Sequence, residues 1–307
     1  MSFFSLLAVL LLEHFRPLTQ RLKIYFQFTR YAIVLERHFN AGEHRHGTIA
    51  WLLAVLPPVI IAALGGYLLG RLNPLLALVW NGAVLYVTMS FKHFGTLASD
   101  ISSALRDQKT EEAVQMLGDW QGRSLVGLET QDIARVAIEQ TLGCAHRQLF
   151  GVMTWFVLLG PGGAVLYRLA LILNQKWGGL EESEFGQFGL FTAKVFGALD
   201  WIPARLTAIS FAIVGDFEDA IYCWRTQAGQ WFSKASGVVL AAGAGALGVR
   251  LGEPLHFPGN LEIRPELGVG EEADADYIDS AMSLIWRALV LWMALIFLLT
   301  IAKWLGS

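Results

Sequence analysis

The stretch 198–220, ALDWIPARLTAISFAIVGDFEDA, places an acid and an arginine inside an apolar run. Asp200 and Arg205 are five positions apart, and Lys194 precedes Asp200 by one to two helical turns. A charge near the centre of a bilayer costs about 2.5–3.5 kcal/mol on insertion scales. We therefore expect Lys194, Asp200 and Arg205 to line a protein-enclosed polar cleft rather than to face lipid.

A cluster of histidines is the second group with chemical potential. His38, His44 and His46 lie close together in the sequence, with Glu43 among them. Three such ligands at short spacing could hold a metal ion. The interpretation we favour is a basic loop at the membrane surface whose histidines respond to pH.

The composition indicates which environment must position these residues. Of the 307 residues, 54% are hydrophobic and 16% are charged, against about 25% charged in globular proteins. Mean hydropathy is +0.47. A net charge of −3 gives no basic field for nucleic acid, which we exclude as a partner. The two cysteines are too few for a disulfide framework and are expected to be free thiols.

Long apolar runs predict an all-α, polytopic membrane protein with about four or five membrane segments and helical or irregular cytoplasmic regions. The runs are 48–70, 75–91, 149–173 with a break at Gly160–Pro161–Gly162–Gly163, 185–199 leading into the stretch 198–220, and 283–302. The apolar N-terminal run ends at Glu13 and lacks a basic segment before it, so we interpret it as part of the mature chain. Whether residues 2–15 span the membrane stays open.

Charge and composition divide the chain into five regions. They are an N-terminal membrane region with a basic interfacial segment (1–94), a cytoplasmic helical domain (95–147), a membrane core (148–215), a Gly-rich cytoplasmic region (216–282) and a C-terminal transmembrane helix (283–307). Six Lys and Arg residues between Arg16 and His46 place that segment in the cytoplasm, and the protein in the cell inner membrane. On this count 149–173 exits and the chain returns by 214, leaving the acidic loop 180–184 outside.

Local rules predict a short helix over 201–214. Asp200 is a good N-cap, Pro203 is tolerated in the first turn and Gly215 suits a left-handed end. Such a helix is about 21 Å long at 1.5 Å per residue. It is too short for a hydrocarbon core of about 30 Å, so we expect a half-helix or a helix lining a cavity.

The string DWIPARLTAISFAIVG (200–215) resembles the signature of the CobD/CbiB family, membrane proteins of cobalamin synthesis. Three further pieces are similar in the same order: GLETQDIARVAIEQT (127–141), LLGPGGAVLYR (158–168) and GALGVRLGEPLHFPGNLEIRPELG (245–268). The resemblance covers about residues 95–290. The N-terminus MSFFSLLAVLLLEHFRPL is instead similar to AmpE, a sister family linked to β-lactamase regulation.

The resemblance implies an adenosylcobinamide-phosphate synthase, which joins aminopropanol to a corrinoid with ATP and Mg²⁺. It also implies acids at several motif positions, where this chain has other residues: Cys144, Gln148, Asn174, Phe196 and Gly197. Because Mg²⁺ takes oxygen ligands, the interpretation we favour is a catalytically degenerate scaffold, sensor or partner protein, with the lipid bilayer, a corrinoid and other proteins as partners. A working synthase would use other acids, such as Glu139, Glu218 and Asp219. A transporter or lipid-binding protein is the third interpretation.

Overall fold

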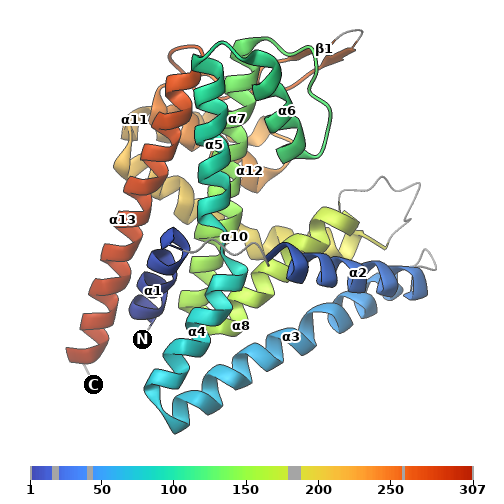
Figure 1. Ribbon diagram of the computed structural model, residues 1–307, viewed down its shortest axis with the longest axis vertical. Helices are drawn as coiled ribbons and strands as arrows, with labels where there is room; N and C mark the ends of the chain where they lie inside the picture. The colour runs from blue at the N-terminus through green and yellow to red at the C-terminus, as the bar shows by residue number, and fades with distance from the viewer. Residues whose placement is uncertain (1, 16–20, 40–43, 179–187, 258–259, 306–307) are drawn as a thin grey trace. The chain divides into compact units, whose positions relative to one another are not determined.

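The computed structural model describes residues 2–15, 21–39, 44–178, 188–257 and 260–305, which are mainly helical (Figure 1). Among these described residues, five stretches are long and apolar enough to cross a membrane: His46–Leu72, Pro74–Arg106, Thr130–Gly178, Leu190–Val214 and Ala275–Ala302. The described residues also include a short antiparallel β-hairpin, which consists of β1 (Leu255–Phe257) and β2 (Asn260–Glu262). The prediction of an all-α polytopic membrane protein is confirmed.

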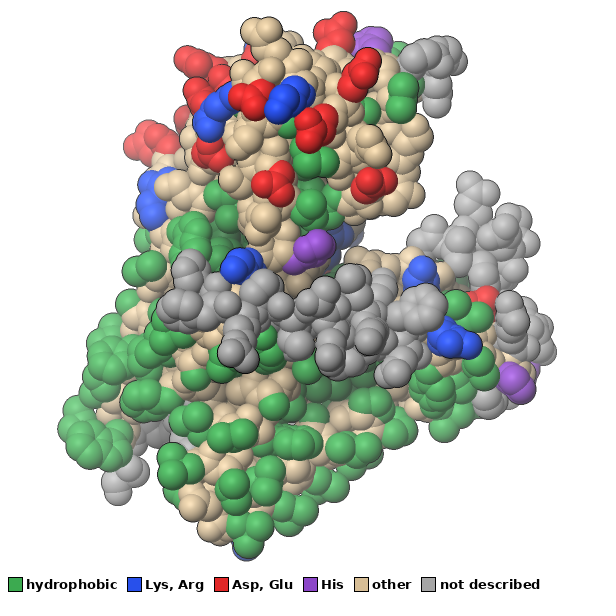
Figure 2. Space-filling view, in the orientation of Figure 1, with side chains coloured by type: hydrophobic (Ala, Val, Ile, Leu, Met, Phe, Trp, Pro, Cys, Tyr) green, Lys and Arg blue, Asp and Glu red, His purple; other side chains and the backbone are tan. Residues whose placement is uncertain are grey.

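The chain forms two compact units, each assembled from separate segments. The first unit contains residues 1–90, 147–202 and 299–307, and the second contains residues 91–146 and 203–298. In Figure 2, hydrophobic side chains cover α3 (His44–Leu72) and α4 (Pro74–Thr88), whereas charged side chains gather over the end of the second unit that carries the loops. Ile61, Leu68 and Val79 are 64%, 57% and 66% exposed, as expected for helices that face lipid.

The first unit holds α1 (Ser2–Phe15), α2 (Arg21–Phe39), α3, α4, most of the π-helix η1 (His146–Phe150), α8 (Gly151–Leu173) and the π-helix η2 (Asn174–Gly178). A tight turn joins α3 to α4: the Asn73 side chain accepts a hydrogen bond from the backbone N–H of Leu75, and Pro74 begins the helix. Trp80 then donates to the carbonyl of Ala62 at 3.0 Å, which holds the two helices together as a hairpin.

Helix α8 folds back on itself at Gly160. Gly160 has φ 68° and ψ −154°, a conformation open essentially to glycine alone. A Cβ atom on Gly151 would lie 2.3 Å from Cζ of Tyr167, although a straight helix would separate these residues by about 24 Å. The predicted break at Gly160–Gly163 is confirmed, and it divides the run 149–173 into two arms.

Helix α10 (Leu190–Val214) corrects the helix expected over 201–214. The apolar residues before Asp200 continue the helix, so Asp200 lies in its middle and is not an N-cap, and Pro203 is inside it. Gly215 follows the last helical residue without a positive φ. Its lack of a side chain is needed for another reason, because a Cβ there would lie 2.6 Å from the carbonyl oxygen of Ala246.

The second unit packs helices around a core of small and aliphatic side chains. It holds α5 (Phe91–Arg106), α6 (Thr110–Gln121), α7 (Thr130–Ala145), α11 (Phe217–Gln227), the short helix η3 (Ala228–Gln230), α12 (Lys234–Leu247), the β-hairpin and most of α13 (Ala275–Leu305). Residues 237–246 of α12 are all buried. Gly245 approaches α11 so closely that a Cβ would lie 2.4 Å from the carbonyl oxygen of Asp219.

Candidate functional site

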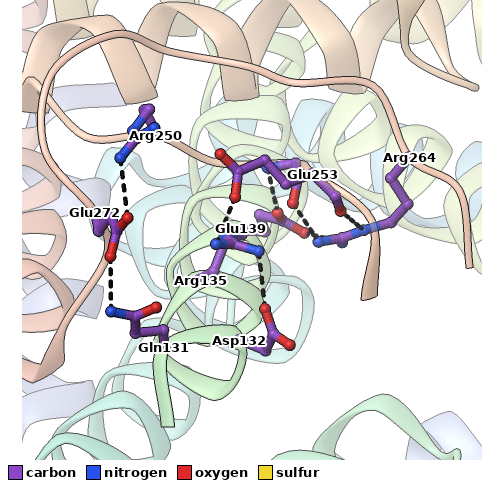
Figure 3. Close-up of polar contacts among 9 residues, drawn as sticks. Gln131, Asp132, Arg135, Glu139, Arg250, Glu253, Arg264 and Glu272 are labelled. Carbon is purple, nitrogen blue, oxygen red and sulfur yellow. Dashed lines mark hydrogen bonds and ion pairs between the residues drawn. The ribbon is translucent and has the colours of Figure 1, made fainter. Parts of the chain in front are cut away.

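The second unit buries an ion pair between α7 and the loop after β2. Arg264 Nη1 donates to Glu139 Oε2 at 2.7 Å, and the two side chains are 5% and 9% exposed (Figure 3). The other Glu139 oxygen accepts from the backbone N–H of Gly252 at 2.9 Å. Arg264 also donates to the carbonyl of Gly252 at 2.7 Å and to that of Glu253 at 3.1 Å. Glu139 therefore binds both the loop backbone and its arginine.

A second arginine on α7 extends this cluster. Arg135 contacts Asp132 at 2.8 Å and Glu253 at 2.6 Å, and its side chain is 7% exposed (Figure 3). Glu253 follows Gly252, and both residues have positive φ, 57° and 74°. A glutamate in this region is uncommon. The two ion pairs and the bonds from Arg264 hold the turn in this conformation.

Spacing along α7 explains how one helix supplies three members of the cluster. Asp132, Arg135 and Glu139 stand at i, i+3 and i+7, which places them on one helical face. Towards solvent, Glu272 continues the series by accepting from Gln131 and Arg250 at 2.7 and 3.1 Å (Figure 3). These contacts fasten the 249–272 segment to α7. Because both oxygens of Glu139 are engaged by Arg264 and Gly252, it is not a free ligand for a cation.

The first unit buries a smaller polar group where α10 meets the two arms of α8. Tyr167 O–H donates to Asp200 Oδ1 at 2.6 Å, and both side chains are buried. Pro203 lacks the N–H that would bond the carbonyl of Leu199, and Trp155 Nε1–H donates to that carbonyl at 3.0 Å instead. The DWIP string thus attaches α10 to the first arm through Trp155 and to the second arm through Tyr167.

The predicted cleft residues have different surroundings. Asp200 is 3% exposed, Arg205 is half-buried and Lys194 is exposed. Asp200 and Lys194 belong to the first unit and Arg205 to the second. A cleft shared by all three stays a prediction.

The three acids predicted as catalytic candidates, Glu139, Glu218 and Asp219, also differ in their surroundings. Glu218 is exposed in the first turn of α11, and the backbone N–H of the half-buried Asp219 donates to Asp216 at 3.0 Å. Among the described residues, Glu139 is bonded to Gly252 and Arg264 and not to either of these acids. Beside Asp219, burial raises the pKa of the Cys223 thiol to about 11, and the charge of Asp219 adds to the effect.

The histidine cluster is described only in part. His38 is exposed on α2, with Nδ1 2.8 Å from the carbonyl of Val34, and His46 is half-buried near the start of α3. The side chain of His44 lies outside the described residues. Among the residues that the structure describes, no group of three or more His, Cys, Asp or Glu side chains is placed to hold a metal ion.

Comparison with known proteins shows that both buried polar groups lie in a region that is similar to a known family. The family model described as "CobD/Cbib protein" matches residues 12–285, a range that includes both groups. The chain belongs to this CobD/CbiB family.

Relatives in the CobD/CbiB family match along most of their length. A protein named "Cobalamin biosynthesis protein CobD" from Stutzerimonas stutzeri is 36% identical over 297 residues, covering 95% of each chain. One of the same name from Chromobacterium violaceum is 36% identical over 246 residues, covering 80% of this chain and 77% of the relative. A "Probable cobalamin biosynthesis protein CobD" from Methanothermobacter thermautotrophicus is 28% identical, covering 69% and 72%. No solved structure matches the chain.

Reasoning from the sequence missed the partners of the acids that it identified. Arg135 and Arg264 lie inside two of the pieces that resemble the CobD/CbiB family, 127–141 and 245–268, yet their pairing was not foreseen. The available signal was the i, i+3, i+7 spacing on one helical face. Tyr167 and Trp155 gave no signal, because an aromatic residue in an apolar helix usually serves packing.

Proposed function

We propose that this CobD/CbiB-family membrane protein no longer catalyses the adenosylcobinamide-phosphate synthase reaction, and that it acts in cobalamin biosynthesis as a scaffold, sensor or regulatory partner. The observation that carries the proposal is the packing of Phe196. At the place where the resemblance implies paired aspartates, the Phe196 ring is 8% exposed and lies 5.8 Å from the ring of Tyr167, centroid to centroid. An apolar contact occupies a position where a magnesium ligand is expected.

The state of Glu139 supports the same proposal. Glu139 is the acid within the matching piece 127–141 that sequence reasoning chose as a catalytic candidate. Through its ion pair with Arg264 and the hydrogen bond that it accepts from Gly252, Glu139 holds the 249–272 segment against α7. Freeing it for a metal would leave Arg264 buried without its carboxylate, a change that typically costs about 3–5 kcal/mol.

An active synthase is the second candidate, and identity to the relatives favours it. Identity of 36% extends over 95% of both chains with a protein named for cobalamin biosynthesis. Such an enzyme would bind a corrinoid and ATP with Mg²⁺. Glu218 and Asp219, on the first turn of α11, would be its most accessible candidate acids.

Two finer features belong to the proposal. The basic segment between Arg16 and His46 favours the cell inner membrane with that segment in the cytoplasm. The AmpE-like N-terminus, which forms α1, favours a signalling role within the regulatory class.

A complementation experiment separates the two candidates. The chain is expressed in a bacterial strain that lacks its synthase and is grown on cobyric acid under conditions that require cobalamin, with the Stutzerimonas stutzeri relative as the positive control. We expect no growth although immunoblotting finds the protein in the membrane. Growth that is lost in a Glu218→Gln, Asp219→Asn variant would make the protein an enzyme and overturn the proposal. That variant changes acids outside the buried cluster, so it tests chemistry without removing the Glu139–Arg264 pair.

A further inference from the structure

The two arms of α8 are each too short to cross a bilayer. The first arm, 151–159, spans about 14 Å and the second arm, 161–173, about 20 Å at 1.5 Å per residue. The hydrocarbon core is about 30 Å thick. At the turn between the arms, Leu158 and Leu159 are 57% and 56% exposed, as expected for a tip that lies among acyl chains.

Contacts with α3 show how far the tip reaches. A Cβ on Gly162 would lie 3.0 Å from the Cβ of Ala63, and a Cβ on Gly66 would lie 2.8 Å from Cγ of Pro161. The tip is therefore beside residues 63–66 of α3. These residues precede the end of α3 at Leu72 by about 9–14 Å of helix. The turn of α8 stops short of the turn that joins α3 to α4.

The ion pair in the second unit limits how often the chain between its two members can cross the membrane. Glu139 precedes α8 and Arg264 follows α10, and their contact at 2.7 Å requires both to lie on one side of the membrane. The chain between them contains the part of the apolar stretch Thr130–Gly178 that follows Glu139, and the whole of Leu190–Val214. Either both stretches cross or neither does. Since α8 returns at Gly160, α10 cannot cross alone.

The packing of α10 agrees with a helix that stays on the side where α8 enters. The Phe188 ring, just before α10, lies 5.2 Å from the ring of Trp177 in η2, which follows the second arm. Further along, Leu199 contacts the first arm and Asp200 the second. From Ile202 to its end, α10 exposes an apolar stripe with helical spacing, consisting of Ile202, Leu206, Ile209 and Ile213. Such a stripe suits a helix embedded in one leaflet.

We propose that residues 147–214 form a re-entrant module that inserts into a single leaflet of the bilayer and leaves on the side where it entered. Its partner is the acyl region of that leaflet, contacted by the Leu158–Leu159 tip and the α10 stripe. Three stretches then cross fully: His46–Leu72, Pro74–Arg106 and Ala275–Ala302. This replaces the expectation that 149–173 exits and the chain returns by 214.

Single cysteines test the proposal in a chain with Cys144→Ala and Cys223→Ala, both native thiols being buried. The exposed reporter positions are Glu112→Cys before the module, Lys176→Cys at the end of the hairpin and Arg71→Cys at the α3–α4 turn, and Leu159→Cys marks the tip. A membrane-impermeant maleimide is added to sealed right-side-out spheroplasts and, separately, to inside-out vesicles.

We expect the Glu112 and Lys176 variants to react in the same preparation, the Arg71 variant to react in the other one, and the Leu159 variant to react in neither. Reaction of the Lys176 variant in the preparation opposite to the Glu112 variant would overturn the proposal. Reaction of the Leu159 variant together with the Arg71 variant would also overturn it, because the tip would then reach the far surface. Gln175→Cys, also exposed, provides a second reporter at the hairpin end. The outcome does not depend on whether the protein is a catalyst.

Discussion

Replacing Glu139 with alanine removes the carboxylate that neutralises Arg264 at the centre of the second unit. Arg264 is 6% exposed, so water cannot readily replace the lost partner. Removing one member of a buried ion pair typically costs about 3–5 kcal/mol. With roughly 2–4 °C of melting temperature per kcal/mol for a unit of this size, we expect Glu139→Ala to melt about 6–20 °C below wild type. The assay is thermal unfolding in detergent micelles followed by circular dichroism.

Two further variants decide whether the buried charge is the cause. Glu139→Leu combined with Arg264→Met leaves neither charge buried, so this double variant should lose less stability than the sum of its single changes. Arg250→Gln breaks a pair whose side chains are 44% and 54% exposed, and it should cost less than about 1 kcal/mol. A Glu139→Ala melting point no lower than that of Arg250→Gln, or strictly additive losses in the double variant, would refute the reasoning.

Other changes probe the hairpin and the thiol. Gly163→Ala places a Cβ 2.1 Å from the backbone oxygen of Trp155 and should lower the melting temperature of the protein in micelles. Gly197→Ala, whose Cβ would have nothing within 4 Å, should leave the melting temperature unchanged or raise it by the equivalent of about 0.5–1 kcal/mol. A lower melting temperature for Gly197→Ala than for Gly163→Ala would contradict the folded-back α8. Tyr167→Phe removes the donor to Asp200 and should cost about 1–3 kcal/mol in the same melts, and an unchanged melting point would show that this bond adds nothing. The buried Cys223, with its pKa raised to about 11, should resist iodoacetamide at pH 8 in the folded protein and react after unfolding, as measured by mass spectrometry. Because the pKa of Cys223 in the folded protein is raised above the usual value of about 8.5, the contribution of this thiol to the free energy of unfolding should persist below pH 8.5 and fall as the pH rises towards 11. Rapid alkylation of Cys223 in the native protein at pH 8 would contradict its buried environment.

The membrane character of the chain was predictable because it depends on composition and run length. The apolar runs and the glycines at 160–163 gave the helices and the break in α8 directly. The direction of the chain after the break was not predictable. A Gly-Pro pair indicates an interruption, but the return of the second arm depends on Tyr167 fitting over Gly151 and on Trp155 meeting Gly163.

The prediction of a helix start at Asp200 was wrong because tertiary contacts override the local N-cap preference. An aspartate before an apolar segment with a nearby proline fits the pattern of an N-cap. Here Tyr167 binds the carboxylate and Trp155 takes the carbonyl that Pro203 leaves free, so the helix continues through both residues. Neither aromatic partner can be identified from the sequence around Asp200. For the same reason, the acid Glu139 was found and its partner Arg264 was not.

The two-segment construction of the second unit has a consequence for synthesis at the ribosome. Glu139 and Arg264 are 125 positions apart, so at 5–20 residues per second the arginine is made roughly 6–25 s after its partner. During that interval Glu139 on the nascent α7 has no guanidinium from the 249–272 segment, and the α8 and α10 segments must be delivered to the membrane. Completion of this unit therefore waits for translation of residues 203–298, and a ribosome that stalls before Arg264 leaves an exposed helix face for quality-control proteases.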